Sequence, residues 1–219
     1  MITFEQIKAS EEINIYISEA DKSLDAIGYT EHSFAHVGKC VSVVEYILQE
    51  LGYDERTVEL AKIAAYMHDI GNVVNRAEHA QSGAIMAFRI LDKIGMTPKD
   101  VASVVTAIGN HDEGTGFPVN AIAAAVILGD KTDVRRTRVR KGAKISEDIH
   151  DRVNFAVEKS EVELDMDKKE ISLLLTVDPA ICSVMEYFEI FLDRMILCTK
   201  AAEFFKLRFR LIINGNVLL

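Results

Sequence analysis

The sequence predicts a mainly helical protein with a small α+β appendage at its C-terminal end. Three observations support this fold class. Apolar residues recur at helical spacing as far as about residue 158, whereas the segments that follow alternate in the manner of strands. The chain has 219 residues, of which 49% are hydrophobic, a length that suits one large domain or a domain with an appendage. We therefore predict a helical bundle over residues 1–158 and an α+β appendage, made of antiparallel strands and one helix, over residues 159–219.

Five helices are expected in the helical unit. The second should follow Asp54 as its N-cap, and Gly71 is placed as the glycine that ends it. Thr97 and Pro98 form a start signal for the fourth, and the segment 113–118 between the last two is expected to be a loop. The expected ranges are Val37–Leu51, Val58–Met67, His79–Ile94, Thr97–Asn110 and Asn120–Val134.

The appendage is expected to open with a two-stranded hairpin. Val162, Leu164 and Met166 alternate with acidic residues, and a second alternating run follows the turn at residues 167–170. A helix from about Ala180 to Lys206 comes next, and a third strand is expected over residues 209–213.

Composition excludes several classes of protein. There are 34 acidic and 25 basic residues, giving a formal charge of −9, and this sign of charge repels nucleic acids and anionic membranes. No apolar run approaches the roughly 20 residues that span a bilayer, and the N-terminal residues lack the features of a signal peptide. The three cysteines, Cys40, Cys182 and Cys198, are expected to be reduced thiols in the core. These features predict a cytoplasmic protein without a membrane partner.

Candidate metal ligands stand at the edges of the apolar helices. Any one of these side chains alone is more often a satisfied structural residue, but the set is unusual. Imidazole and carboxylate ligands suit Mn²⁺, Fe²⁺, Co²⁺ or Zn²⁺. The set exceeds what one ion needs, and the two oxygens of Asp69 could bridge a pair of ions. The candidates are His36, His68, Asp69, His79, His111 and Asp130.

The order of these residues resembles the HD-domain superfamily of metal-dependent phosphohydrolases. The segment His-Asp-Ile-Gly at 68–71 resembles its HD box, and residues 110–118 resemble the HHE…GYP segment of its dinuclear branch, which includes HD-GYP phosphodiesterases and diadenosine-polyphosphate hydrolases. The resemblance covers roughly residues 32–140. It implies that His36, His68, Asp69 and Asp130 hold one metal ion, and that Asp69 bridges to a second ion held by His79 and His111.

The chain also departs from the HD-GYP pattern. Asn72 stands where Lys is usual, Asn110 replaces the first of two paired histidines, and Phe117 replaces Tyr. These differences argue against cyclic dinucleotide hydrolysis in particular. His32 lies four residues before His36 and could be an alternative ligand or a substrate contact, although a capping or surface role is the commoner one. His150 has no place in the pattern and is expected at the surface or between domains.

A basic block follows Asp130. Seven of the 25 basic residues lie between positions 131 and 144, and arginine binds phosphate oxygens with two parallel hydrogen bonds. One alternative is a solvated helix end, and another is pairing with the acidic residues Glu161, Glu163 and Asp165 of this or another subunit. A nucleic-acid role is disfavoured because no aromatic residues are interleaved. The candidates for phosphate binding are Lys131, Arg135, Arg136 and Arg138.

The leading hypothesis is hydrolysis of a phosphate ester or anhydride of a nucleotide-like substrate by a metal-bridging hydroxide. Asp69 would be the catalytic residue that positions the bridging oxygen. Asp112 or Glu113 could assist proton transfer, although both are expected to be exposed loop residues. One alternative is an oxygenase with a di-iron centre, as in some members of the superfamily. Another is a non-catalytic module with a structural metal site, in which the apolar helix near the C-terminus forms a homodimer interface.

Overall fold

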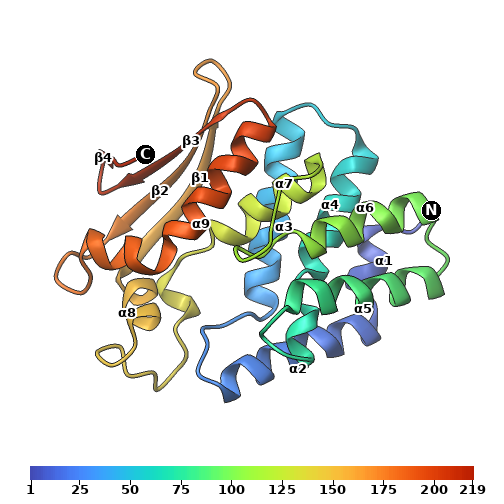
Figure 1. Ribbon diagram of the computed structural model, residues 1–219, viewed down its shortest axis with the longest axis horizontal. Coiled ribbons are helices and arrows are strands. Elements are labelled where there is room, and N and C mark those ends of the chain that lie inside the picture. Colours follow the sequence, from blue (N-terminus) through green and yellow to red (C-terminus); the bar gives the residue numbers. More distant parts are fainter.

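The computed structural model describes residues 1–219 and shows a helical body joined to a four-stranded sheet (Figure 1). The chain ends lie on opposite sides of the molecule in this view. No helix is both long enough and apolar enough to cross a membrane. The helices are α1 (Phe4–Lys8), α2 (Glu11–Ala26), α3 (Phe34–Glu50), α4 (Glu55–Met67), α5 (His79–Lys93), α6 (Pro98–Gly109), α7 (Ala121–Lys131), α8 (Ile149–Ala156) and α9 (Val184–Phe204), and the strands are β1 (Val157–Asp165), β2 (Glu170–Val177), β3 (Arg208–Ile213) and β4 (Asn216–Val217).

Side-chain caps begin the helices of the body. The Asp54 carboxylate accepts a hydrogen bond from the Thr57 backbone nitrogen, and the Thr97 hydroxyl accepts one from that of Asp100. Ser33 and Asn120 cap α3 and α7 in the same way. Each cap satisfies a backbone N–H that has no partner inside its helix. The mainly helical fold class and the five expected helices are therefore confirmed, while α1, α2 and α8 were not predicted.

Two helix ends differ from the prediction. The α7 helix ends at Lys131 rather than at Val134, because the chain turns at Thr132. Lys131 and Arg135 therefore do not share a helical face. Gly71 does not end α4 with a positive φ; it lies in a short 3₁₀-helix, Ile70–Val73, that follows His68 and Asp69. A glycine is required at position 71 because the backbone at the start of α5 approaches it closely. A Cβ there would lie 2.0 Å from the His79 carbonyl oxygen.

The sheet has the order β1-β2-β3-β4. As predicted, β1 and β2 form an antiparallel hairpin, in which Val162 is opposite Leu173. The expectation of antiparallel strands is wrong for β3, which pairs parallel to β2. The reason is that α9 runs back along the sheet and returns the chain to the starting edge, as a crossover helix does. Asn214 and Gly215, with φ values of 50° and 79°, form the tight turn to β4.

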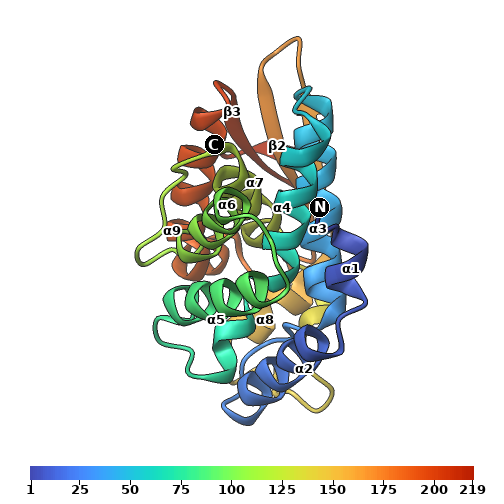
Figure 2. The same cartoon turned by 90° about the vertical axis from the view of Figure 1, so that its right-hand side faces the viewer.

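Two hydrophobic cores meet at α7. Ile122 and Val126 belong to the core of the helical body, whereas Ile127 and Leu128 belong to the core beneath the sheet and α9. The α7 helix contacts α9 as well as α4 and α6, and Figure 2 shows it between α9 and α4. All three cysteines are buried free thiols. The predicted boundary after residue 158 falls within β1, and the division into 1–158 and 159–219 stays a prediction.

Candidate metal centre

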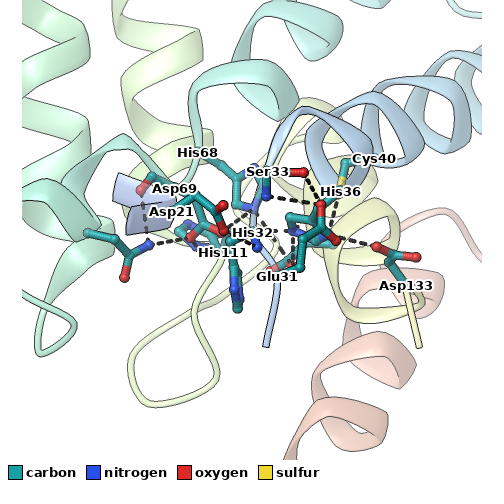
Figure 3. A network of polar contacts seen from close by, with 12 residues as sticks. Asp21, Glu31, His32, Ser33, His36, Cys40, His68, Asp69, His111 and Asp133 are labelled. Carbon is teal, nitrogen blue, oxygen red and sulfur yellow. Dashed lines mark hydrogen bonds and ion pairs between the residues drawn. The ribbon is translucent and has the colours of Figure 1, made fainter. Parts of the chain in front are cut away.

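The fold brings all six predicted metal ligands into one cluster. His36 lies in the first turn of α3, and His68 and Asp69 follow the end of α4. His79 begins α5, His111 follows the end of α6, and Asp130 lies in the last turn of α7. All six are buried, with none more than 7% exposed. Figure 3 shows the imidazole rings of His36, His68 and His111 gathered around Asp69.

One half of the cluster contains two imidazoles and two carboxylates. His36 Nε2 lies 3.4 Å from Asp130 Oδ1 and 3.8 Å from Asp69 Oδ2. His68 Nε2 lies 3.3 Å from the same Asp69 oxygen and 3.7 Å from Asp130 Oδ1. Each of these two carboxylate oxygens therefore lies within 3.8 Å of both imidazole nitrogens.

The other half uses the second oxygen of Asp69. His79 Nε2 and His111 Nε2 lie 3.4 Å and 3.8 Å from Asp69 Oδ1, and 3.1 Å from one another. Asp112 Oδ1 lies 3.8 Å from His79 Nε2. The carboxylate of Asp69 thus stands between the two halves, with one oxygen directed to each.

Hydrogen bonds at the far side of each ring fix its orientation. His36 Nδ1 donates to Asp133 Oδ2 at 2.8 Å. His68, His79 and His111 donate through Nδ1 to backbone carbonyl oxygens of Ala65, Arg76 and Ile108. An imidazole that donates through Nδ1 presents the lone pair of Nε2, and such outer partners are typical of metal-binding histidines.

The chemistry of the cluster fits a cation. His68 Nε2 is buried and makes no hydrogen bond. Burial disfavours the charged form of this ring, yet the nearby carboxylates of Asp69 and Asp130 raise the pKa of His68 to about 10. Burial lowers the pKa of His79 to about 4, so this ring is in the neutral form that binds metal. The first half therefore attracts positive charge strongly, and its donor atoms are those of a transition-metal site.

Cys40 also lies against the cluster. Its Sγ is 3.7 Å from His36 Nε2 and is close enough to His68 and Asp130 to belong to the same group of potential ligands. Burial raises the pKa of the Cys40 thiol well above its ordinary value. Because the thiolate is the form that binds metal, we assign Cys40 a packing role beside His36.

Two positioning residues were missed by the sequence analysis. Asp133 orients His36, and its only signal was its place three residues after Asp130. Asn72, noted only as a departure from the HD-GYP pattern, donates through Nδ2 to Asp69 Oδ1 at 2.9 Å. It therefore holds the oxygen of Asp69 that faces the second half of the cluster.

His32 is not at the surface and caps no helix. It is 7% exposed, its ring centroid lies 5.3 Å from that of His36, and its Nδ1 donates to the Thr30 carbonyl oxygen at 2.7 Å. Its Nε2 is left without a protein partner. Of its two functional alternatives, ligand and substrate contact, the position beside a pocket favours the second. His150 is exposed, as expected, and lines the same pocket.

The basic block is divided among different environments. Lys131 is buried, and its Nζ lies 2.8 Å from both Asp130 Oδ2 and Glu113 Oε2. Burial alone would lower the pKa of Lys131, but these carboxylates raise it. Arg138 is also buried and donates to the backbone oxygens of Glu31 and Asp133. Both lie close to the metal centre.

The other two candidates of the block are engaged elsewhere. Arg135 pairs with Asp133 at 2.8 Å and with Glu31 at 3.4 Å. Arg136 stacks on the Phe155 ring and donates to the Phe155 carbonyl oxygen. Within this chain the block does not pair with the acidic residues 161, 163 and 165 of the hairpin. Phosphate binding by these two arginines stays a prediction.

The loop after His111 is less exposed than expected. Glu113 is 19% exposed and pairs with Lys131 and with Arg194 Nε, the latter at 2.7 Å. Burial raises the pKa of Glu113, but the two cations outweigh this and hold it well below its ordinary value. Asp112 is 27% exposed. Glu113 is therefore an ion-pairing residue that connects α7 to α9.

A pocket of about 390 Å³ adjoins the cluster. His32, Arg76 and Glu113 line it. The His32 ring packs against that of His36, Arg76 Nη1 lies 3.3 Å from His79 Nε2, and Glu113 is connected to Asp130 through Lys131. On the outer side α9 contributes Phe191 and Arg194. The appendage thus forms part of the pocket wall, and no pattern in the sequence identified Arg76 or Arg194.

Comparisons with known proteins place the chain in a family. The chain is 23% identical over 208 residues to an uncharacterized protein of Methanocaldococcus jannaschii, covering 84% of this chain and 80% of that protein. It also resembles the crystal structure of a predicted HD superfamily hydrolase from an uncultured Thermotogales bacterium, with a TM-score of 0.46 and 26% identity over 57% of this chain and 67% of that one. The model of the HD domain family matches residues 33–147. That match spans more than half of the sequence and all six clustered residues, and the chain therefore belongs to the HD domain family.

Proposed function

We propose that the protein is a metal-dependent phosphohydrolase that cleaves a phosphate ester or anhydride of a nucleotide-like substrate. The observation that carries the proposal is the position of Asp69, whose Oδ2 faces His36 and His68 while its Oδ1 faces His79 and His111. This arrangement suits two divalent transition-metal ions, of Fe, Mn, Co or Zn, joined by one carboxylate. Ions held there would lower the pKa of a water molecule and neutralise charge on a phosphoryl group.

The chain's own residues divide the remaining work. Asp69 holds the two halves together, and Asn72 fixes its orientation through the 2.9 Å hydrogen bond. Lys131 neutralises Asp130 from the side away from His36. His32 donates through Nδ1 to Thr30, so its Nε2 beside the pocket is placed to accept a hydrogen bond from a substrate hydroxyl. Arg138 contributes a buried positive charge near the same point.

Elemental analysis tests the metal centre first. Protein purified without added metal should contain about two transition-metal ions per chain. The same preparation should then be screened with p-nitrophenyl phosphate, bis-p-nitrophenyl phosphate and nucleotides. Oxygen consumption by an iron-loaded sample, with no phosphate released from any substrate, would support the oxygenase alternative instead. Protein that takes up no metal on reconstitution would contradict both and favour the non-catalytic module.

Substitution of Asp69 tests the mechanism. Asp69→Ala should abolish turnover and release metal while leaving the circular dichroism spectrum helical, because the carboxylate serves both halves. Asp167→Ala, in the exposed hairpin turn, is the matched control and should keep both metal and activity. Activity in metal-depleted Asp69→Ala protein would overturn the proposal.

A further inference from the structure

Three arginines from distant parts of the chain line the pocket beside the metal centre. Arg76 follows the 3₁₀-helix after Asp69, Arg138 follows α7, and Arg194 lies on α9. The lining carboxylates, Glu113 and Asp148, are already engaged: Glu113 pairs with Arg194, and Asp148 caps α8. The pocket therefore carries positive charge on a chain whose formal net charge is −9.

Each of these guanidinium groups has hydrogen-bonding capacity that the protein does not use. Arg76 makes no ion pair, and its protein contacts are Asn72 Oδ1 at 3.4 Å, His79 Nε2 at 3.3 Å and the Tyr29 ring. Arg138 is 2% exposed, and its Nη2 is buried without any partner. Arg194 uses Nε for Glu113, which leaves both of its terminal nitrogens free. Burial of a charged donor without a partner is costly, so Arg138 Nη2 indicates that an anion binds here. The free nitrogens of Arg76 and Arg194 are available to the same anion.

Arg194 is held in place from both sides. Its guanidinium lies over the Phe191 ring, 4.5 Å from the centroid. Its Nε pairs with Glu113 Oε1, while Glu113 Oε2 pairs with Lys131, which pairs in turn with Asp130. A continuous chain of ion pairs thus runs from a metal ligand to α9. The position of Arg194 is therefore set relative to the metal centre, although it belongs to the C-terminal part of the molecule.

We propose that this pocket binds a second anionic group of the substrate and that Arg194 determines specificity for it. The substrate is then an organic phosphate with at least two anionic groups, one at the metal centre and one at Arg138 and Arg194. The volume of about 390 Å³ lies in the range of about 300–1,000 Å³ usual for small-molecule sites, and Tyr29 and Ile27 offer apolar surface to its organic part. The inference rests on the proposed function because the first group is placed at the metal centre.

Binding of two non-hydrolysable probes tests this inference. Methylphosphonate offers one anionic group and propane-1,3-diphosphonate offers two, so titration calorimetry on metal-loaded protein can compare them without turnover. We expect the diphosphonate to bind at least about tenfold more tightly, since it gains charge-assisted hydrogen bonds. Arg194→Gln should remove that difference and leave methylphosphonate binding and metal content unchanged. Arg194→Lys should retain part of it, because lysine keeps the charge without the two-pronged geometry.

The controls separate failure of this inference from failure of the proposed function. Lys200→Gln, at an exposed position of the same helix, makes the same change of charge and should leave the affinity for both probes unchanged. If Arg194→Gln does not fold, Arg194→Lys and the wild-type comparison of the two probes still decide the question. Equal binding of both probes to wild-type protein, with methylphosphonate bound only when metal is present, would overturn this inference alone. Failure of both probes to bind metal-loaded protein would overturn the proposed function as well.

Discussion

The two halves of the metal centre are built from the same residue types but differ in charge and in support. In the first half, His36 and His68 share two carboxylates, and Asp133 adds a third negative charge behind His36. In the second half, His79 and His111 face one oxygen of Asp69, and the nearest further carboxylate, Asp112, is partly exposed at 3.8 Å. The pKa values reflect this difference: that of His68 is raised to about 10, while that of His79 is lowered to about 4.

From this difference we expect the two halves to bind metal with unequal strength. Affinity for a divalent cation rises with the number of charged ligands and with the rigidity of the site. The first half has more carboxylates and is anchored in α3, α4 and α7, which pack together in the core. The second half is attached to the start of α5 and to the loop after α6. We therefore expect the second ion to be the more easily lost.

The largest expected effect comes from removing one histidine from each half. His68→Ala should leave less than about one metal ion per chain, because the site with the higher affinity is broken. His79→Ala should leave about one, because the first half stays intact. Elemental analysis after gel filtration measures both. If His79→Ala loses as much metal as His68→Ala, the two halves form one cooperative site and the comparison does not hold.

A substitution at the junction of the halves should have the next largest effect. Gly71 lies between Asp69 and α5, and a Cβ there would come within 2.0 Å of the His79 carbonyl oxygen and 2.5 Å of the Gly83 nitrogen. Gly71→Ala should lower the free energy of unfolding by about 3 kcal/mol, as severe overpacking does, and should weaken the second site. Gly38→Ala, where a Cβ would have no neighbour within 4 Å, should be neutral or stabilising by up to about 1 kcal/mol. Denaturant titration compares the two.

Removal of the charge behind His36 should weaken the first half without breaking it. Asp133→Asn keeps the shape of the side chain but removes the carboxylate that accepts from His36 Nδ1 at 2.8 Å. Loss of such a partner typically costs about 10- to 100-fold in metal affinity. Competition with a chelator of known affinity should show this loss for the tightly bound ion. An unchanged affinity would mean that the packing around His36 orients the ring by itself.

The smallest effect is expected at Cys40. Because the thiol lies against His36 with a raised pKa, Cys40→Ala should leave the metal content unchanged. Loss of an ion in this variant would show that the first half includes a sulfur ligand, and would favour zinc among the candidate metals.

The sequence was sufficient to predict α3 to α7 and the six residues that cluster as candidate ligands, because both depend on local patterns. Asp54, Thr97 and Pro98 signal helix starts through backbone hydrogen bonding within a few residues. His36, His68, Asp69, His79, His111 and Asp130 stand at helix edges, and burial of the apolar faces brings those edges together. The same local patterns explain why the hairpin of β1 and β2 was predicted, whereas the parallel pairing of β3 depends on the path of α9.

Tertiary structure alone decided which charged residues meet the metal centre. The sequence analysis grouped four basic residues after Asp130 as candidates for phosphate binding, yet one of them, Arg136, stacks on Phe155. Arg76 and Arg194, which do line the pocket, are 118 positions apart in the sequence. A long charged side chain can point in many directions, and its partner is chosen by the packing of helices distant in sequence. Asp133 and Glu113 acquire their roles for the same reason. The candidate metal ligands could therefore be identified from the sequence by itself, and the residues that surround the pocket required the packing of α9 against α7.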